Sequence, residues 1–91
     1  MAWTILYTPS AARAIRKLDP QVQRRVRAAV RALADEPLRG KPLQLSLKGL
    51  RSWRTGDYRI VYRVVADRIE IVVVAVGHRR EVYEQLRDRL R

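Results

Sequence analysis

The sequence has no cysteine and only one histidine, His78. The absence of cysteine excludes a disulfide framework, a thiolate metal site and a thiol nucleophile. One histidine cannot build a multi-histidine metal centre, and no phosphate-binding or dinucleotide-binding glycine motif occurs in the sequence. No pair of acidic residues stands where a metal-dependent nuclease would need it. We therefore expect a protein that holds no metal and no cofactor.

Long apolar runs are missing as well. The longest, Ile71–Val76, is far shorter than the ~20 residues of a membrane-spanning helix. The first residues, Met1–Tyr7, do not combine a basic region with a sustained apolar run, as a signal peptide would. These absences predict a cytoplasmic protein with no membrane partner, and a length of 91 residues predicts a single domain, 1–91.

Positive charge is what the chain has in excess. Twenty Lys and Arg residues outnumber nine Asp and Glu residues, which leaves a net charge of +11. Seventeen of the twenty cations are arginines, whose planar guanidinium group binds phosphate in a bidentate manner. The excess covers both halves of the chain, and an apolar fraction of 47% is ordinary for a folded protein. A polyanionic partner is therefore expected.

Apolar periodicity predicts the element order β-α-α-β-β-β-α. Alternating apolar residues predict four strands, at residues 3–7, about 45–54, 58–65 and about 68–76. Helical spacing predicts three helices that begin at Pro9, Pro20 and Glu81, the first two preceded by the capping residues Thr8 and Asp19. The expected class is α+β, with a small antiparallel-rich sheet and a helical hairpin packed on one face.

Breaks in the periodicity predict the connections. Pro37 is expected to end the second helix, and residues 38–45 are expected to form a loop. Thr55-Gly56-Asp57 fits a hairpin turn, and Gly77 is expected to end the last strand. That strand is nearly all Ile and Val, which is typical of a central strand covered on both faces. Val82, Leu86 and Leu90 share one face of the last helix.

Cations gather on the expected sheet and directly after it. Lys48, Arg51 and Arg54 lie on or beside the second strand, and Arg59 lies on the third. His78 and Arg79 follow the last strand, and Tyr83 stands four residues after Arg79, on the same face if a helix begins there. An antiparallel meander can bring His78, Arg79 and Tyr83 close to Arg59, so that the four residues surround one phosphate group.

Each of these residues also has a structural interpretation. Arg59 can be solvated or ion-paired, Tyr83 can be a packing residue, and His78 can be solvated or cap a helix. Tyr58 and Tyr62 are expected to belong to the core, because they alternate with its apolar residues. The two tryptophans are expected to pack or to form a protein-binding surface, with stacking on bases as the alternative.

The proposed constellation could cleave RNA without a metal. The ribose 2′-hydroxyl attacks the adjacent phosphorus, which requires a group that accepts its proton and a group that protonates the leaving 5′-oxygen. Guanidinium groups that face the phosphoryl oxygens stabilise the charge that develops there. DNA lacks the 2′-hydroxyl and would not be cut.

On these residues the chain resembles the RelE/ParE superfamily of toxins from bacterial type II toxin–antitoxin pairs. The resemblance runs from Trp3 to Leu90 and is carried by Trp53-Arg54-Thr55-Gly56-Asp57-Tyr58-Arg59-Ile60-Val61-Tyr62 and by Val76-Gly77-His78-Arg79-Arg80-Glu81-Val82-Tyr83. The chain is more similar to the RelE branch, whose members cut messenger RNA in the ribosomal A site. The resemblance thus implies a ribosome-dependent mRNA endoribonuclease that is neutralised by a cognate antitoxin.

The resemblance also implies roles for individual residues. Arg59 would contact the scissile phosphate, Arg79 would act as general acid or charge stabiliser, and Tyr83 would activate the 2′-hydroxyl or stack on a base. The auxiliary or RNA-binding candidates are Lys48, Arg51, Arg54 and His78. The sequence departs from the family at Leu50 and Ser52, where the best-known members have lysines.

This departure leaves other functions open. A ParE-like inhibitor of DNA gyrase would share the fold and perform no RNA chemistry. A degenerate toxin would act only with its antitoxin in DNA-bound autorepression. The expected partners are the antitoxin, the ribosome and messenger RNA, and DNA is contacted only through the antitoxin complex.

Overall fold

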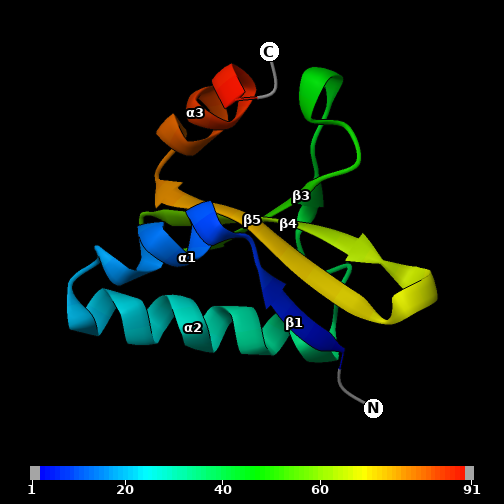
Figure 1. Ribbon diagram of the computed structural model, residues 1–91, viewed down its shortest axis with the longest axis horizontal. Coiled ribbons are helices and arrows are strands. Elements are labelled where there is room, and N and C mark those ends of the chain that lie inside the picture. Colours follow the sequence, from blue (N-terminus) through cyan, green and yellow to red (C-terminus); the bar gives the residue numbers. More distant parts are fainter. Residues whose placement is uncertain (1–2, 90–91) are drawn as a thin grey trace.

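The computed structural model describes residues 3–89 and confirms the α+β class (Figure 1). The elements in chain order are β1 Thr4–Tyr7, α1 Pro9–Arg16, α2 Pro20–Asp35, β2 Lys41–Pro42, the 3₁₀ helix η1 Leu45–Leu47, β3 Arg51–Thr55, β4 Tyr58–Val65, the 3₁₀ helix η2 Ala66–Arg68, β5 Glu70–His78 and α3 Glu81–Arg89. Within the described residues, none of the helices has the length and apolar character needed to cross a membrane.

One five-stranded sheet organises the fold, in the order β1-β5-β4-β3-β2. Strand β1 runs parallel to β5, and the other neighbours are antiparallel. Helices α1 and α2 cover one face of the sheet, and α3 packs on the other (Figure 1). The expected helical hairpin on one face is therefore confirmed, as is a central β5 covered on both faces.

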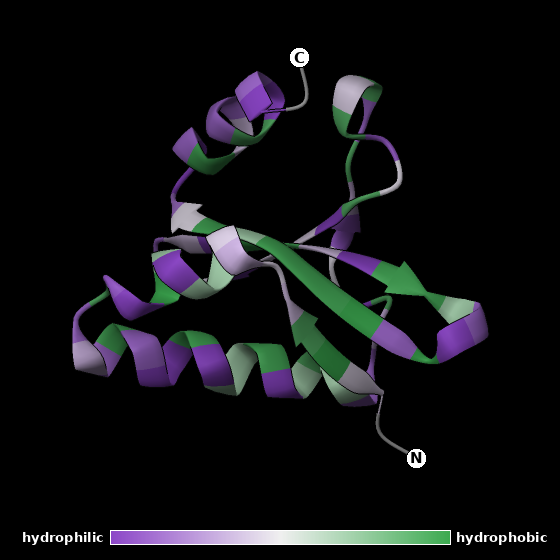
Figure 2. Cartoon of the chain, viewed as in Figure 1, coloured by the Kyte–Doolittle hydropathy of each residue, from purple (hydrophilic) through white to green (hydrophobic). Residues whose placement is uncertain are grey.

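The sheet separates two groups of buried side chains. The larger group lies under α1 and α2 and includes Ile15, Val30, Ile60 and the fully buried Tyr62. The smaller group lies under α3 and comprises Leu47, Val61, Ala75, Val82 and Leu86. Figure 2 shows the corresponding apolar bands along β5 and on the inner side of the helices. Each helix is thus held by burial of one apolar stripe.

A bulge in β5 decides which residues face which group. Tyr62 pairs with Val73 and Val61 pairs with Ala75, so Val74 is the extra residue between them. The extra residue reverses the alternation along β5. Val73 before the bulge therefore belongs to the larger group, whereas Ala75 two residues later belongs to the smaller group under α3.

The helix starts differ in their caps. The Thr8 hydroxyl accepts a hydrogen bond from the Ala11 backbone N–H at 3.2 Å, as expected for the cap of α1. The Asp19 side chain makes no capping hydrogen bond at the start of α2, so that part of the prediction is wrong. Pro20 still begins the helix, because its fixed φ suits the first helical position.

Residues 38–50 depart most from the sequence prediction. The expected loop contains β2, which pairs with Arg51 and Ser52. Residues 45–47 form a 3₁₀ helix instead of the expected strand. Leu45 has a φ of 56° and Gly49 a φ of 97°, and both values are incompatible with an extended strand. Strand β3 therefore begins at Arg51.

Gly77 does not end the last strand, which continues to His78. A Cβ atom at Gly77 would lie 2.8 Å from the Cβ of Val82, so glycine here permits the close approach of α3 to β5. The last helix begins at Glu81, as predicted. Leu90, expected on its apolar face, lies outside the described residues.

Candidate functional site

Arg59 lies on β4, on the sheet face that α3 covers. It stands between Arg54 of β3 and Gly77 of β5, and its guanidinium carbon is 5.8 Å from the centre of the Tyr83 ring. Its Nε atom is buried and has no hydrogen-bond partner among the described residues. Like charges that face each other across strands repel, and a buried unpaired donor costs about 1–3 kcal/mol. A bound anion would offset both effects.

Arg79 reaches the same place from the connection between β5 and α3. Its φ of 53° is left-handed, which is unfavourable for a residue with a Cβ atom, and its N–H donates to the Asp57 carbonyl oxygen at 2.6 Å. This hydrogen bond ties the connection to the β3–β4 turn. A hollow of about 310 Å³ lies between them, lined by Arg54, Gly56, Asp57, Arg59, Arg79 and Arg80.

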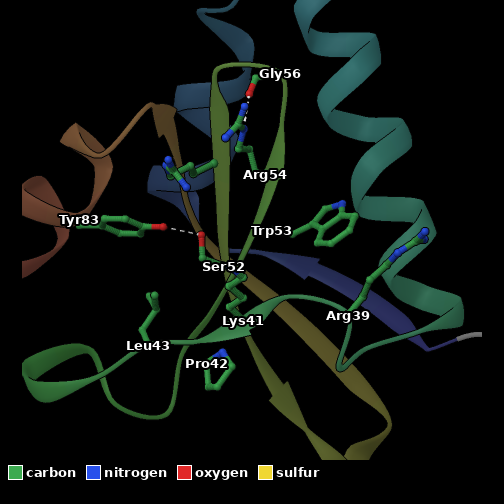
Figure 3. A pocket seen from close by; sticks show the side chains of 10 residues that line it. Arg39, Lys41, Pro42, Leu43, Ser52, Trp53, Arg54, Gly56 and Tyr83 are labelled. Carbon is green, nitrogen blue, oxygen red and sulfur yellow. Dashed lines mark hydrogen bonds between the residues drawn. The ribbon is translucent and has the colours of Figure 1, made fainter.

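Tyr83 is in the first turn of α3. Its hydroxyl and the Ser52 hydroxyl are 2.7 Å apart, which connects α3 to β3 (Figure 3). Because α3 begins at Glu81, Arg79 does not share a helical face with Tyr83. The two residues meet at the site through Arg59, which Tyr83 contacts and which lines the same hollow as Arg79.

A second hollow of about 560 Å³ adjoins the first at Arg54 and Arg59. It is lined by Arg39, Lys41, Pro42, Leu43, Ser52, Trp53, Arg54, Gly56, Arg59 and Tyr83 (Figure 3). Four of these residues are cations and none is acidic. The adjoining hollows therefore form a strongly basic surface with aromatic side chains on it, a combination suited to single-stranded nucleic acid.

Three of the residues selected from the sequence lie elsewhere. Lys48 is exposed after η1 and lines neither hollow. Arg51 faces α2 and donates from Nε to the Gly40 carbonyl at 3.0 Å. His78 pairs with Tyr58, and the two rings meet edge to face at 5.3 Å on the side opposite Arg59. The structure thus brings together Arg54, Arg59, Arg79 and Tyr83.

Lys41, Ser52 and Arg39 line the larger hollow but were not candidates from the sequence. Lys41 is the register partner of Ser52, so the two side chains lie on the same sheet face as Tyr83. A two-residue strand shows no periodicity, which is why the sequence predicts a loop at Lys41. A signal was present for Ser52, because it occupies one of the family's lysine positions.

Comparison with known proteins adds independent information. Residues 5–83 match the family described as the ParE toxin of the type II toxin-antitoxin system, parDE. Toxin RelG of Mycobacterium tuberculosis is 38% identical over 87 residues, covering 93% of this chain and 100% of the relative. Toxin RelE of the same organism is 32% identical over 81 residues, covering 87% of this chain and 84% of the relative.

Solved structures agree with these matches. The toxin–antitoxin complex RelBE2 of M. tuberculosis contains a chain with 38% identity and a TM-score of 0.81, with 87% of this chain and 100% of that chain covered. A mutant of Escherichia coli toxin RelE in the free state has 23% identity and a TM-score of 0.77, with both chains fully covered. The second match supports the fold alone.

Proposed function

Because the chain belongs to the RelE/ParE superfamily of toxins from type II toxin–antitoxin systems, we propose that it is a ribosome-dependent mRNA endoribonuclease that inhibits translation. The observation that carries this proposal is the buried Nε of Arg59, which has no hydrogen-bond partner within residues 3–89, on a side chain that stands opposite Arg54 and near the Tyr83 ring. A site of this kind fits a phosphate group. The similarity to toxins named RelG and RelE favours the RNA-cleaving branch.

In the proposed reaction the ribose 2′-oxygen attacks the adjacent phosphorus and the bond from phosphorus to the 5′-oxygen breaks. The products are a 2′,3′-cyclic phosphate and a 5′-hydroxyl, so one proton leaves the 2′-oxygen and one joins the 5′-oxygen. Arg59 and Arg79 contact the phosphoryl oxygens and stabilise their growing charge. Arginine keeps its proton in proteins, so proton transfer falls to groups such as Tyr83 and Lys41.

The ribosome supplies what this small site lacks. Two adjoining hollows of about 310 and 560 Å³ contact only a short stretch of RNA, so orientation of the message must come from elsewhere. The positive charge of the chain suits docking against ribosomal RNA. This target places the activity in the cytoplasm.

A cognate antitoxin is the second proposed partner. Toxin–antitoxin complexes are among the structural relatives, and the RelBE2 complex is one of them. An acidic antitoxin segment would neutralise the basic hollows and block access of RNA.

Primer extension on programmed ribosomes tests the activity and the site together. We expect the wild type to cut the message and the triple variant Arg59→Ala/Arg79→Ala/Tyr83→Phe to lose at least about 10³-fold in rate, since removal of one such donor costs about 10²–10³-fold. Arg63→Ala is the matched control, because Arg63 is exposed on the same strand but lines neither hollow. Equal cutting by the wild type and the triple variant would refute the site assignment.

Inhibition of DNA gyrase remains the second candidate function. It is favoured by the ParE description of the matching family and by Leu50 and Ser52 in the family's lysine positions. Supercoiling by purified gyrase, with and without the protein, separates the two. Inhibition of gyrase without cleavage on ribosomes would replace the nuclease proposal.

A further inference from the structure

The larger hollow extends around the free edge of β3. Strand β2 pairs only with Arg51 and Ser52, so within residues 3–89 no strand covers the outer edge of β3 beyond Ser52. Ser52 and Trp53 are consecutive, and their side chains point to opposite faces of the sheet. Both nevertheless line the same hollow, with Tyr83 on one side of β3 and Trp53 on the other (Figure 3).

On the Trp53 side, a guanidinium group lies over the indole ring in a cation–π contact. The inner part of Trp53 packs against the larger core group, and the guanidinium carbon of Arg39 lies 4.9 Å from the ring centre. Arg39 itself is exposed. A planar guanidinium group stacks on nucleobases as well as on aromatic rings, so the exposed Arg39 supplies the hollow with a group that can stack on a base.

The backbone on both sides of Arg39 is fixed. Arg51 donates to the Leu38 carbonyl at 3.1 Å and to the Gly40 carbonyl at 3.0 Å. The Gly40 N–H donates to the hydroxyl of the fully buried Tyr62 at 2.9 Å. The loop is therefore anchored to β3 and β4, and Arg39 projects from a defined position over Trp53.

We propose that the Arg39–Trp53 pair is a nucleobase subsite. The RNA strand crosses the free edge of β3, its scissile phosphate lies against Arg59, and the base of an adjacent nucleotide stacks on the Arg39 guanidinium. The position of the phosphate rests on the proposed function. The stacking surface rests on separate observations, which are the 4.9 Å contact and the anchored loop.

Binding of a short DNA strand with and without bases tests the subsite without any cleavage. The probes are a deoxyadenosine hexamer and an abasic deoxyribose-phosphate strand of equal length, titrated at one fixed ionic strength. We expect the wild type to bind the hexamer about tenfold more tightly, equivalent to about 1.4 kcal/mol of stacking. In Trp3→Phe protein, the hexamer should quench the fluorescence of Trp53 and the abasic strand should not.

Two substitutions of Arg39 separate stacking from charge. Arg39→Lys keeps the charge but loses the planar group, so it should bind the abasic strand like the wild type and show less than a threefold preference for the hexamer. Arg39→Ala should lose the same preference and should also bind the abasic strand more weakly than the wild type, because it removes a charge from the hollow. Arg63→Ala, outside both hollows, should keep the preference for the hexamer in full. A preference that both Arg39 variants retain in full would overturn the subsite.

The outcome is independent of catalysis. If the wild type does not cleave the message on ribosomes but still prefers the hexamer to the abasic strand, the nuclease proposal is wrong and the subsite remains. Cleavage by the wild type together with an unchanged preference in both Arg39 variants would remove only the subsite.

Discussion

Replacing Arg59 with methionine should stabilise the protein while slowing RNA cleavage by about 10²–10³-fold. The substitution removes a buried Nε that has no hydrogen-bond partner among residues 3–89, which costs about 1–3 kcal/mol. It also removes a like charge opposite Arg54 on the neighbouring strand, which costs about 0.2–1 kcal/mol. It loses the cation–π contact with Tyr83, which contributes about 0.5–1 kcal/mol. The unbranched methionine side chain retains much of the packing of the arginine stem. The net expectation is a gain of about 1 kcal/mol in the free energy of unfolding.

Urea-induced unfolding followed by circular dichroism measures this gain. For a domain of this size, 1 kcal/mol corresponds to a rise of about 4–8 °C in Tm. Exchanging chloride for phosphate at constant ionic strength should stabilise the wild type more than Arg59→Met, because phosphate binds the folded site. Arg63→Met, an exposed position on the same strand, is the control and should change stability little.

The opposite sign would refute the reasoning. If Arg59→Met lowers the free energy of unfolding by more than about 0.5 kcal/mol while Arg63→Met stays near zero, the guanidinium group stabilises the fold. An equal response of wild type and Arg59→Met to phosphate would show that the anion binds elsewhere.

Three further predictions concern the framework of the site. Tyr62→Phe removes a hydroxyl that accepts from the Gly40 N–H and donates to the Pro37 carbonyl, just before β2. It should lower the free energy of unfolding in urea by about 2–3 kcal/mol. The control Tyr58→Phe, whose hydroxyl has no hydrogen bond among the described residues, should change it little. Gly77→Ala forces a Cβ against Val82; we expect a loss of about 1–3 kcal/mol and slower cleavage on ribosomes, and an unchanged rate would show that α3 need not lie so close to β5. Burial raises the pKa of Tyr7 above 10.0, against the opposing effect of nearby arginines. The unfolded chain then releases this proton first, so the stabilising effect of Tyr7 is complete below about pH 10 and is lost as the pH rises further; Tyr7→Phe should flatten that decline in unfolding measurements.

Local signals in the sequence predicted most of the elements correctly. Thr8-Pro9 marks the start of α1, and Tyr58 to Val65 alternates over the bounds of β4. The Ile- and Val-rich run of β5 predicted burial on both faces, and the structure confirms it. These properties depend on residues within a turn of helix or a few positions of a strand, so the sequence alone determines them.

It is harder to predict from the sequence which residues lie together at the site. The sequence pattern groups Arg51 and Arg54 as neighbouring cations, yet they are three positions apart on one strand and point to opposite faces. The sequence pattern predicts His78 near Arg59, but the pairing of His78 with Tyr58 puts it on the other side of the sheet. Strand parity could have separated the first pair, whereas the position of His78 required the register of β4 and β5.

The sequence by itself determined the α+β elements, the basic character of the chain and the Arg59, Arg79 and Tyr83 candidates. Only the tertiary structure decided that Lys41 and Arg39 join the basic surface and that Arg79 reaches it from a strained turn. The physical reason is that helices and strands form from short-range periodicity and capping. A site formed by several strands depends on register, on the bulge in β5 and on long-range hydrogen bonds such as that between Arg79 and Asp57.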